Sequence, residues 1–404
     1  SYFYPGVNTS MVLTNAMPSL KSKVLSYAKL RGAFARVGSD ASPYQLQTVF
    51  QGSSTKFGSL PQFSLSDNLA NANLKPEQTT SAELGAELAF FDSRVTLDAS
   101  YYDKETKNQI LNLVIPPTSG YSTQAINAGQ ISNKGFEATL GANLLKSDAG
   151  LNWTSTFNYA RNKSRVVSLT PGLTTVVLGT QRSASVTATV GHPYGELTGY
   201  TFLRDASGNL LTQNGMPIRG PQAVLGNVNP DWVGGWNNEF KFGRVTASFL
   251  LSFHEGGKFF SNTNMMCDQS GMCANTLKGR EVDWNKPGIV VKGIDRTTQQ
   301  PNTINVTSEQ YFQSLWLINQ AYTYDDSYVK LREMRVGYDL PSRFAQRLNA
   351  QALNVALVGR NLWTHSNVPN IDPEFTYNTG NAQGLEFAPM PTNRSIGITV
   401  QVTP

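Results

Sequence analysis

Apolar and polar residues alternate along several segments of this chain, with the two-residue period of a β-strand that has one apolar face. The clearest case is the segment 79–90, where apolar side chains occupy every second position: Ala82, Leu84, Ala86, Leu88 and Phe90. A tight turn at 91–93 follows, and the segment 94–103 alternates in the same way. Two alternating segments joined by a minimal turn predict a β-hairpin.

The same pattern predicts about eleven strands along the chain. They are expected at 2–14, 24–37, 79–90, 94–103, 131–145, 151–166, 233–242, 245–255, 327–340, 352–362 and 394–402. Short turns join some neighbouring strands, whereas long polar loops join others. The long loops are expected at 38–78, 104–130, 168–230 and 256–324, with strand-like pieces at 186–203. Because short turns and long loops alternate along the chain, the turns are expected at one end of the sheet and the loops at the other.

This arrangement predicts an all-β fold, an antiparallel transmembrane β-barrel with short turns at one rim and long loops at the other. No apolar run approaches the roughly 18 residues that a spanning helix needs. Two soluble all-β folds are less expected. A propeller would show a repeat of roughly 40 to 50 residues, which this chain lacks. A sandwich would have strands of about five or six residues, shorter than those expected here. Because a closed single-chain bacterial barrel has an even number of strands, eleven strands are expected to be part of a larger barrel. The chain also starts inside an expected strand, without a signal peptide, as a piece of a longer protein would.

Composition narrows the function classes. Charged residues make up 15% of the chain, below the roughly 25% of typical soluble domains. The net charge is +5 and the isoelectric point is near 9.0, but the basic residues are scattered rather than clustered in a phosphate track. Nucleic-acid binding is therefore not expected.

Cys267 and Cys273 are separated by five residues. No histidine lies near enough to complete a zinc site, so no metal is expected. A small loop-closing disulfide would indicate an oxidising compartment. The alternative is two free thiols in a surface loop, and mass spectrometry with and without reductant distinguishes the two.

The polar side chains on strands do not predict an enzyme. Glu83, Glu87 and Asp98 are better explained as lining the wet interior of a barrel. There is no G-x-S-x-G nucleophile motif. The histidines, at positions 192, 254 and 365, lack the H-E-x-x-H spacing of a zinc peptidase.

Aromatic residues near strand ends and in loops are the candidate binding residues. Tyr121, Trp232, Tyr377 and His254 are candidates for substrate contact, since aromatic faces suit sugar rings and peptide side chains. For the first three, a place in the aromatic girdle at the membrane interface is an equally open alternative. Trp236 and Trp363 are candidates for that girdle, which is favoured over substrate stacking for these two. No cofactor is expected.

The hairpin at 325–374 has a polar connection that begins at Pro341. The interior side of its first strand is expected to carry Leu331, Glu333, Arg335, Gly337 and Asp339, because charges belong in the lumen rather than in lipid. Arg332 would then point the other way, near an interface.

Several segments resemble the C-terminal part of the SusC/RagA family of TonB-dependent outer-membrane transporters from Bacteroidetes. They include YFYPGVNTSMVLT at the start, LKPEQTTSAELGAELAFFDSRVTLDASYYDKETKNQIL, NAGQISNKGFEATLGANLL, GHPYGELTGY, LGNVNPDWVGGWNNEFKFGRVTASFLLSFHEGGK, YVKLREMRVGYDLP and GRNLWTHSNVPNIDPE. Each alone is weak, but their order and spacing are specific. The chain departs from the family by ending in Val-Thr-Pro rather than on an aromatic residue.

The resemblance implies that residues 1–404 are the C-terminal part of the β-barrel domain of a Gram-negative outer-membrane transporter. A barrel of 22 strands, plugged by an N-terminal domain, would then be completed by sequence outside this chain. The family implies a SusD-like surface lipoprotein as lid, energy from the TonB–ExbB–ExbD complex, and import of oligosaccharides or oligopeptides. The alternative is a surface receptor or adhesin barrel without transport.

Overall fold

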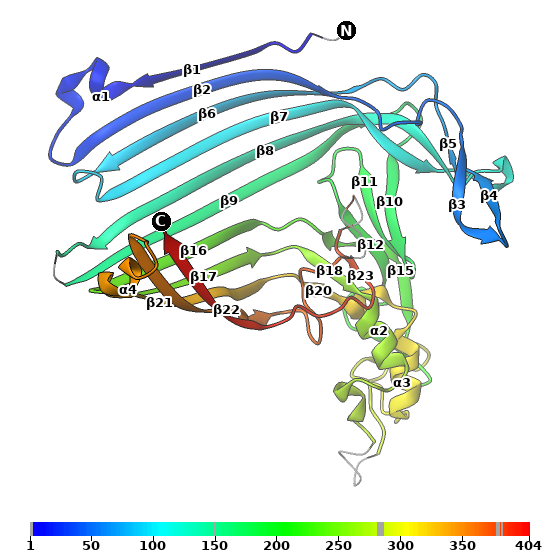
Figure 1. The fold of residues 1–404 in the computed structure, drawn as a ribbon. Coiled ribbons are helices and arrows are strands. Elements are labelled where there is room, and N and C mark those ends of the chain that lie inside the picture. Colours follow the sequence, from blue (N-terminus) through cyan, green and yellow to red (C-terminus); the bar gives the residue numbers. More distant parts are fainter. Residues whose placement is uncertain (1–2, 149, 281–286, 377–379, 381–382) are drawn as a thin grey trace.

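The computed structural model describes residues 3–148, 150–280, 287–376, 380 and 383–404. Its main feature is one long antiparallel sheet (Figure 1). The strands along it are β1 (Gly6–Val12), β2 (Leu25–Ser39), β6 (Glu77–Phe90), β7 (Val95–Val114), β8 (Thr123–Leu145), β9 (Leu151–Leu169), β16 (Trp232–Phe242), β17 (Val245–Glu255), β21 (Tyr328–Asp339), β22 (Ala352–Ser366) and β24 (Ser395–Thr403). Each expected strand overlaps one of these eleven, so the all-β antiparallel prediction is confirmed for this chain.

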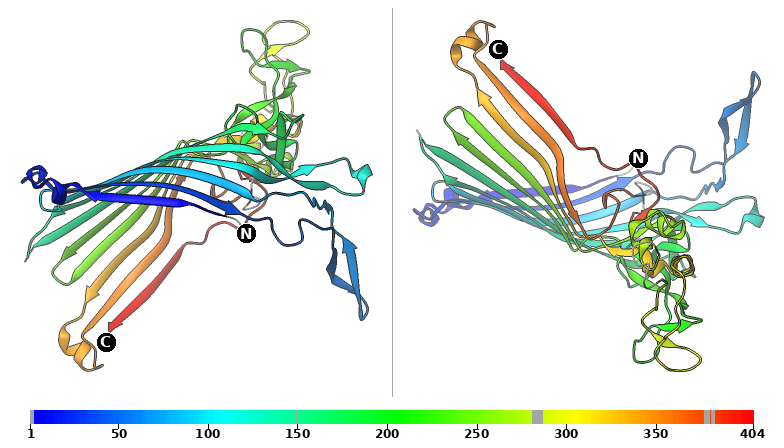
Figure 2. Two further views of the ribbon diagram at one scale, coloured as in Figure 1. Left: turned by 90° about the horizontal axis from the view of Figure 1, so that it is seen from above. Right: turned by 90° about the horizontal axis from the view of Figure 1, so that it is seen from below.

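The sheet is strongly curved and open in the described part of the chain (Figure 2). The first strand, β1, pairs with β2, and the last strand, β24, pairs with β22. A short additional strand, β5 (Asn68–Leu69), pairs with β8 in parallel. None of the described helices is long and apolar enough to cross a membrane.

Short and long connections lie at opposite ends of the sheet, as expected (Figure 1). The short-turn end carries α1 (Leu13–Ala16), η1 (Pro18–Leu20) and α4 (Ser342–Gln346). The turn between β6 and β7 places Phe91, Asp92 and Ser93 at φ values of 52°, 55° and 63°. Consecutive left-handed residues let the two strands reverse within a minimal turn.

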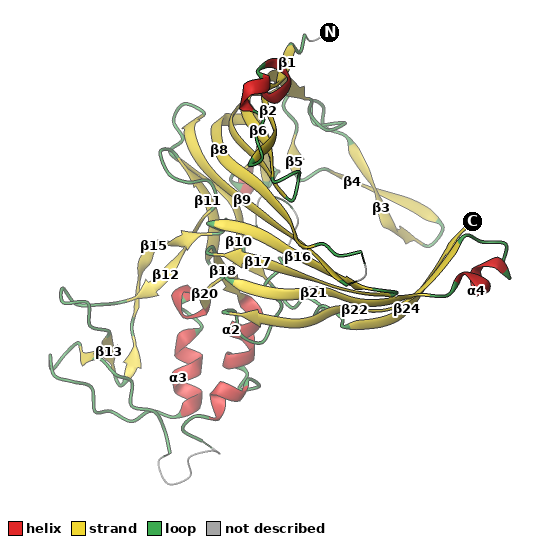
Figure 3. Cartoon of the chain, turned by 90° about the vertical axis from the view of Figure 1, so that its left-hand side faces the viewer, coloured by secondary structure: helices red, strands yellow, loops and turns green. Residues whose placement is uncertain are grey.

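The loop-bearing end holds most of the remaining structure and the main hydrophobic core (Figure 3). Its elements are β3 (Phe50–Phe57), β4 (Leu60–Leu65), η2 (Pro117–Ser119), β10 (Thr175–Gln181), β11 (Ala184–Thr189), β12 (Glu196–Phe202), β13 (Leu211–Gln213), β14 (Met216–Pro217), β15 (Arg219–Asn227), β18 (Lys258–Ser261), α2 (Asn262–Gln269), η3 (Ala274–Leu277), β19 (Ile294–Asp295), α3 (Ser308–Leu315), η4 (Asn319–Tyr322), β20 (Thr323–Asp325) and β23 (Leu385–Glu386). The core joins Val186 and Leu197 of the small sheet to Phe260, Met265 and Phe312 beside and on the helices.

The long sheet has one apolar and one polar face, and the register aligns them from strand to strand. Leu84 of β6 lies opposite Tyr101 of β7, which lies opposite Phe136 of β8. At the far edge, Leu357 of β22 lies opposite Ile398 of β24. All five of these apolar side chains are exposed. An exposed apolar face on alternating strands is typical of the lipid-facing side of a membrane barrel.

Two expectations about loops differ from the structure. The expected loop at 104–130 is wrong, because β7 and β8 continue as a hairpin in which Val114 pairs with Thr123. Register shifts at 107–110, where Asn108 adopts φ 56°, break the two-residue period that would have revealed the extension. The strand-like pieces expected at 186–203 are confirmed as β11 and β12.

A β-bulge changes which side chains of β21 face the polar side. Leu331 and Glu333 pair with the adjacent residues Leu251 and Leu250 of β17, so Arg332 is one extra residue in β21. Such a bulge places two successive side chains on one face. Leu331 was expected on the polar side with Glu333, which is wrong: Arg332 contacts the polar-side Ser252, and Leu331 faces the apolar side.

Candidate functional site

The polar face of the sheet carries a cluster of four charged side chains at its loop-bearing end, here called the Lys330 cluster. It consists of Lys330, Arg332, Asp372 and Glu374. Lys330 Nζ lies 2.5 Å from Asp372 Oδ1 and 2.7 Å from Glu374 Oε2. Only 2% of the Lys330 side chain is exposed, so its charge depends on these two carboxylates rather than on water.

Arg332 extends the cluster toward the neighbouring strand. Its Nη1 donates to Glu374 Oε2 at 2.6 Å, its Nη2 contacts the second Glu374 oxygen, and its Nε donates to Ser252 Oγ at 2.7 Å. The hydroxyl of Tyr328 donates to Glu374 Oε1 at 2.9 Å. A fork of this kind fixes the carboxylate in orientation as well as in distance.

The acidic half of the cluster belongs to the connection between β22 and β24. Asp372 Oδ1 accepts the backbone N–H of Glu374 at 3.1 Å, and Asp372 also contacts Thr392. Burial opposes ionisation of Glu374, but the hydrogen bonds from Arg332 and Lys330 outweigh it and hold its pKa at about 2. The cluster therefore binds this connection, residues 367–376, to β21.

A second contact ties the same connection to α2. Asn264 Nδ2 donates to the carbonyl of Pro369 at 2.9 Å, and Asn370 Nδ2 donates to Asn264 Oδ1 at 2.9 Å. Asn264 is held at the first turn of α2, where its backbone N–H donates to the capping Ser261 Oγ at 3.0 Å. The connection is thus fixed on one side to the sheet and on the other to the helices.

Beside the Lys330 cluster lies a buried carboxyl group with a raised pKa. Burial is the main cause that raises the pKa of Asp326 to about 8, and the neighbouring charges of Asp325 and Glu374 add to it. Within the described residues, Asp326 Oδ1 has no hydrogen-bond partner. For Asp325, burial is outweighed by hydrogen bonds from Ser327 and Asn367, which lower its pKa to about 2.

His254 is part of this packing rather than an open side chain. Its Nδ1 lies 2.9 Å from the carbonyl oxygen of Asp326, and its ring stacks on Tyr328 with centroids 4.8 Å apart. Only 14% of its side chain is exposed. These contacts occupy the ring face and one nitrogen, so they favour a structural role over the expected substrate contact.

The two tryptophans of β16 lie on the apolar face of the sheet. Trp232 stacks on Tyr159 of β9 with ring centroids 5.6 Å apart. Trp236 donates from Nε1 to Ser155 Oγ at 2.9 Å and meets Phe249 edge-on. An aromatic row on the apolar face favours a place in the membrane-interface girdle over substrate contact, for Trp232 as well as for Trp236.

The remaining predicted aromatics lie near the loop-bearing end. Trp363, half exposed, is on the apolar face of β22 and stacks on His365. Tyr121 is half-buried in the loop at the tip of the β7–β8 hairpin, where its N–H donates to Ser119 Oγ. Tyr377 lies outside the described residues. Among the described candidates, Trp232 and His254 lie on opposite faces of the sheet, and Tyr121 lies in the β7–β8 loop, so the structure does not gather these three in one place.

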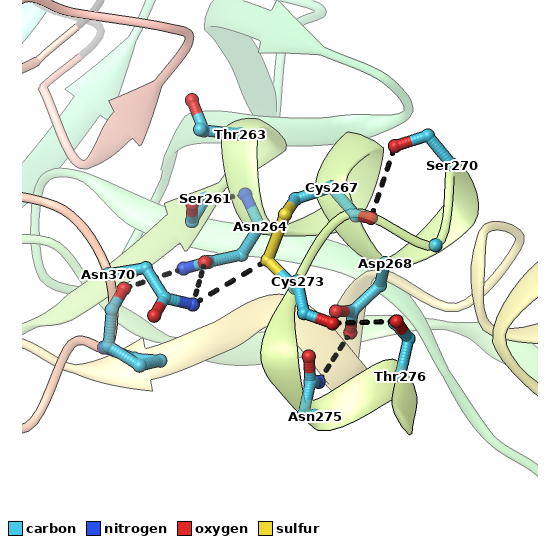
Figure 4. Close-up of a disulfide and its surroundings, with 12 residues drawn as sticks. Ser261, Thr263, Asn264, Cys267, Asp268, Ser270, Cys273, Asn275, Thr276 and Asn370 are labelled. Carbon is cyan, nitrogen blue, oxygen red and sulfur yellow. Dashed lines mark hydrogen bonds between the residues drawn. A yellow bond between two sulfur atoms is a disulfide. The ribbon is translucent and has the colours of Figure 1, made fainter. Parts of the chain in front are cut away.

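Cys267 and Cys273 form a disulfide, with Cα atoms 5.3 Å apart (Figure 4). The bond joins α2 to the segment before η3, next to the Asn264 and Asn370 contacts. Among the described residues, no group of three or more histidine, cysteine or acidic side chains is arranged to hold a metal.

Sequence reasoning missed the Lys330 cluster and the buried Glu386. The Glu386 carboxylate is fully buried and accepts hydrogen bonds from Ser261 Oγ at 2.7 Å and Thr263 N at 3.3 Å, at the start of α2. Its partners are more than a hundred positions away in sequence, so no local pattern points to them. The one available signal for the Lys330 cluster was the group of charges in YVKLRE and IDPE on either side of one hairpin.

Comparison with known proteins gives one family and several relatives. The family described as "TonB dependent receptor-like, beta-barrel" matches residues 23–362. TonB-dependent receptor P3 of Formosa agariphila is 25% identical over 410 residues, covering 93% of this chain and 39% of the receptor. Receptor P26 of the same organism is 26% identical, covering 99% of this chain and 42% of the receptor. The chain thus spans about two fifths of the length of these curated relatives.

A shorter match and a solved structure complete the comparison. TonB-dependent receptor SusC of Bacteroides thetaiotaomicron is 27% identical over 103 residues, which cover 25% of this chain and 10% of SusC. The RagAB peptide importer in its closed-closed state is similar in fold, with a TM-score of 0.75 at 17% identity, and the likeness covers 99% of this chain and 43% of the importer chain.

Proposed function

Since the chain belongs to the TonB-dependent receptor β-barrel family, we propose that it forms the C-terminal part of an outer-membrane importer of oligopeptides or oligosaccharides. Receptors of this family are transporters rather than enzymes. The observation that carries the proposal is the family match over residues 23–362, on a sheet whose apolar face is exposed and whose polar face carries buried ion pairs. Its eleven strands would supply half of a 22-stranded barrel in a Gram-negative outer membrane.

The proposed partners follow from the relatives. A SusD-like surface lipoprotein would close the loop-bearing end, as the likeness to SusC and to the RagAB importer supports. The TonB–ExbB–ExbD complex would supply energy through parts of the whole protein outside this chain. We propose Tyr121 and Tyr377 as substrate contacts, and Trp236 and Trp363, with Trp232, as the aromatic girdle. The disulfide fits an oxidising compartment, as this location requires.

Within this function, the Lys330 cluster has a mechanical role. It fixes the connection 367–376 against β21, at the end of the sheet where substrate would enter from outside. A connection held by ion pairs on one side and by α2 on the other gives the entrance a defined shape. Substrate would then meet a preformed surface, which lowers the entropy that ordering the loops would cost on binding.

The test is uptake by the whole protein in its native host. Cells that carry the full-length gene are supplied with a labelled peptide mixture or a labelled glycan mixture, and surface-bound and internal label are measured separately. Import predicts internal label that disappears when tonB is deleted, while surface binding persists. Surface binding without TonB-dependent internal label would instead identify the alternative, a receptor or adhesin barrel.

A further inference from the structure

A basic groove lies on the outward side of the sheet at the loop-bearing end. It has a volume of about 890 Å³. Its cationic lining comes from β8 and β9: Lys134, Arg161, Lys163 and Arg165. All four side chains are exposed. Lys134 lies directly opposite Lys163, so two like charges meet across the strand pair, and Asp103 neutralises only Lys134.

These cations lie on the apolar side of the sheet, at its aromatic border. On β9 the outward positions run from Phe157 and Tyr159 to Arg161, Lys163 and Arg165. The ring of Tyr159 lies 6.3 Å from that of Phe136 on β8 and stacks on Trp232 of β16. Arg161 follows Tyr159 by roughly 7 Å along β9. It lies directly opposite Phe136, so the basic side chains begin at this aromatic border. That is the depth at which lipid headgroups meet a barrel wall.

The counter-charges in the groove are too few to neutralise it. Asp103 lies 2.7 Å from Lys134, and Asp231 lines the opposite wall. Among the described residues, Arg161, Lys163 and Arg165 have no salt bridge. The groove therefore holds two more cations than carboxylates (four against two), with three guanidinium or ammonium groups open to a ligand.

The walls of the groove make it more than a charged surface. β9 continues past the point where β16 ends, and its free edge is bonded by the loop at 191–192: the Gly191 N–H donates to Val166 O, and the Val166 N–H donates to His192 O. The opposite wall is the segment 227–231 that leads into β16. A polar, walled recess directly above an apolar surface fits an amphipathic molecule, with acyl chains below and a charged head above.

We propose that this groove binds the phosphorylated headgroup of a lipid in the outer leaflet of the membrane. Arg161, Lys163 and Arg165 would contact phosphate oxygens, because guanidinium groups match phosphate in geometry and charge. The acyl chains would lie along the apolar face below Tyr159 and Phe136. The lipid would anchor the β8–β9 part of the rim and set how far the loops stand above the membrane.

The experiment uses the full-length protein purified in a non-ionic detergent. It is titrated with a fluorescent lipid A that carries two phosphates, with the dephosphorylated lipid A, and with inorganic phosphate alone. The variant is Arg161→Gln/Lys163→Gln/Arg165→Gln. We expect the bisphosphorylated lipid to bind the variant on the order of a hundredfold more weakly, about fivefold per cation removed. The dephosphorylated lipid should bind wild type and variant equally.

The matched control is Lys21→Gln/Lys23→Gln/Lys146→Gln, which removes three exposed cations at the short-turn end. It should bind the bisphosphorylated lipid as wild type does. Equal binding of this lipid by wild type and groove variant would overturn the proposal. Inorganic phosphate that binds the wild type as tightly as the lipid does would assign the groove to a free anion instead. If the triple variant does not fold, Lys163→Gln alone should weaken binding of the bisphosphorylated lipid about fivefold.

Discussion

The polar face of the sheet carries two ion clusters of similar composition and different surroundings. The first, here the Arg31 cluster, joins Lys29, Arg31, Glu87 and Asp98 across β2, β6 and β7. Its side chains are between 27% and 49% exposed. In the Lys330 cluster, by contrast, the Lys330 side chain is 2% exposed and its ammonium group contacts two carboxylates from a distant connection. Similar charges at similar distances thus act differently, because water screens one cluster and is largely excluded from the other.

The difference teaches what each cluster is for. Exposed ion pairs contribute little to stability, since water and salt compete for both partners. They instead supply the fixed polar surface that a wet lumen needs. A buried pair is costly to assemble and costlier to break, so it fixes one arrangement of the elements that it joins. The Lys330 cluster therefore determines the position of the 367–376 connection, whereas the Arg31 cluster covers the water-exposed polar face of the sheet.

The largest effect is expected from Lys330→Met. The substitution leaves Asp372 and part of Glu374 without their buried cation, which should cost about 3–5 kcal/mol. The measurement is the unfolding temperature of the full-length protein, which is monitored through its heat-dependent mobility in gels. Lys29→Met is the matched control in the exposed cluster and should shift the unfolding temperature little. Equal shifts for the two variants would mean that the Lys330 cluster and the Arg31 cluster contribute equally to stability.

The second prediction concerns pH. Asp326 keeps its proton in the folded state up to a pKa of about 8, whereas an unfolded aspartate has released it above about pH 4. Between about pH 4 and pH 8, folding therefore takes up a proton at Asp326. The stability that this protonation contributes is lost as the pH rises through that range. Between pH 6 and 8, stability should fall by at most about 2 kcal/mol relative to Asp326→Asn. Glu374 and Asp325 lose their charge only at lower pH and do not contribute here.

That prediction is checked by calorimetric unfolding of wild type and Asp326→Asn at several pH values. The informative quantity is the difference between the two proteins, because other titrating groups cancel in it. A difference that stays constant from pH 6 to 8 would mean that Asp326 is ionised in the folded protein.

A smaller effect is expected from Asn264→Ala. The substitution removes the hydrogen bonds to the Pro369 carbonyl and to Asn370, at a cost of about 1–2 kcal/mol. The 367–376 connection should become more sensitive to limited proteolysis while the sheet stays intact. Asn367→Ala, which removes a bond on the other side of the connection, tests whether both attachments matter. Unchanged cleavage in both variants would mean that the Lys330 cluster alone holds the connection.

The smallest effect is expected from Glu87→Gln in the Arg31 cluster. Arg31 keeps Asp98, at 2.7 Å, and the lost pair with Lys29 is exposed to water. We expect no measurable change in unfolding temperature at physiological salt. A shift as large as that of Lys330→Met would show that water is excluded from the Arg31 cluster as much as from the Lys330 cluster.

The sequence predicted the strands well because alternation is a local property. Leu84 and its neighbours reveal their faces without reference to any other strand. The helices were missed, although α3 carries a capping box between Thr307 and Gln310 that announces a helix start. The capping box lies inside the expected loop at 256–324, where no hydrophobic period marks a helix.

The charged site was not predictable in the same way. Lys330 and Glu374 are 44 positions apart, and the charges in their two segments do not say which of them meet. The facing of Arg332 depends on a bulge, because Arg332 is one extra residue of β21 between Leu331 and Glu333, which pair with the adjacent Leu251 and Leu250 of β17. A two-residue period read along β21 alone has no access to that partner strand.

The bulge at Arg332 also restricts how this hairpin can change in length. On either side of it, β21 follows the same alternation shifted by one residue. Deleting Arg332 would restore an unbroken alternation that keeps Lys330 on the polar face and Leu331 on the apolar face, while it removes the guanidinium group from Glu374. A deletion elsewhere in β21 would turn the residues on one side of it to the opposite face, because a slip of one residue exchanges the faces of a strand. This strand can therefore lose a residue at position 332 and keep Lys330 on its carboxylates, whereas a loss between Glu333 and Asp339 would misplace one part of the strand.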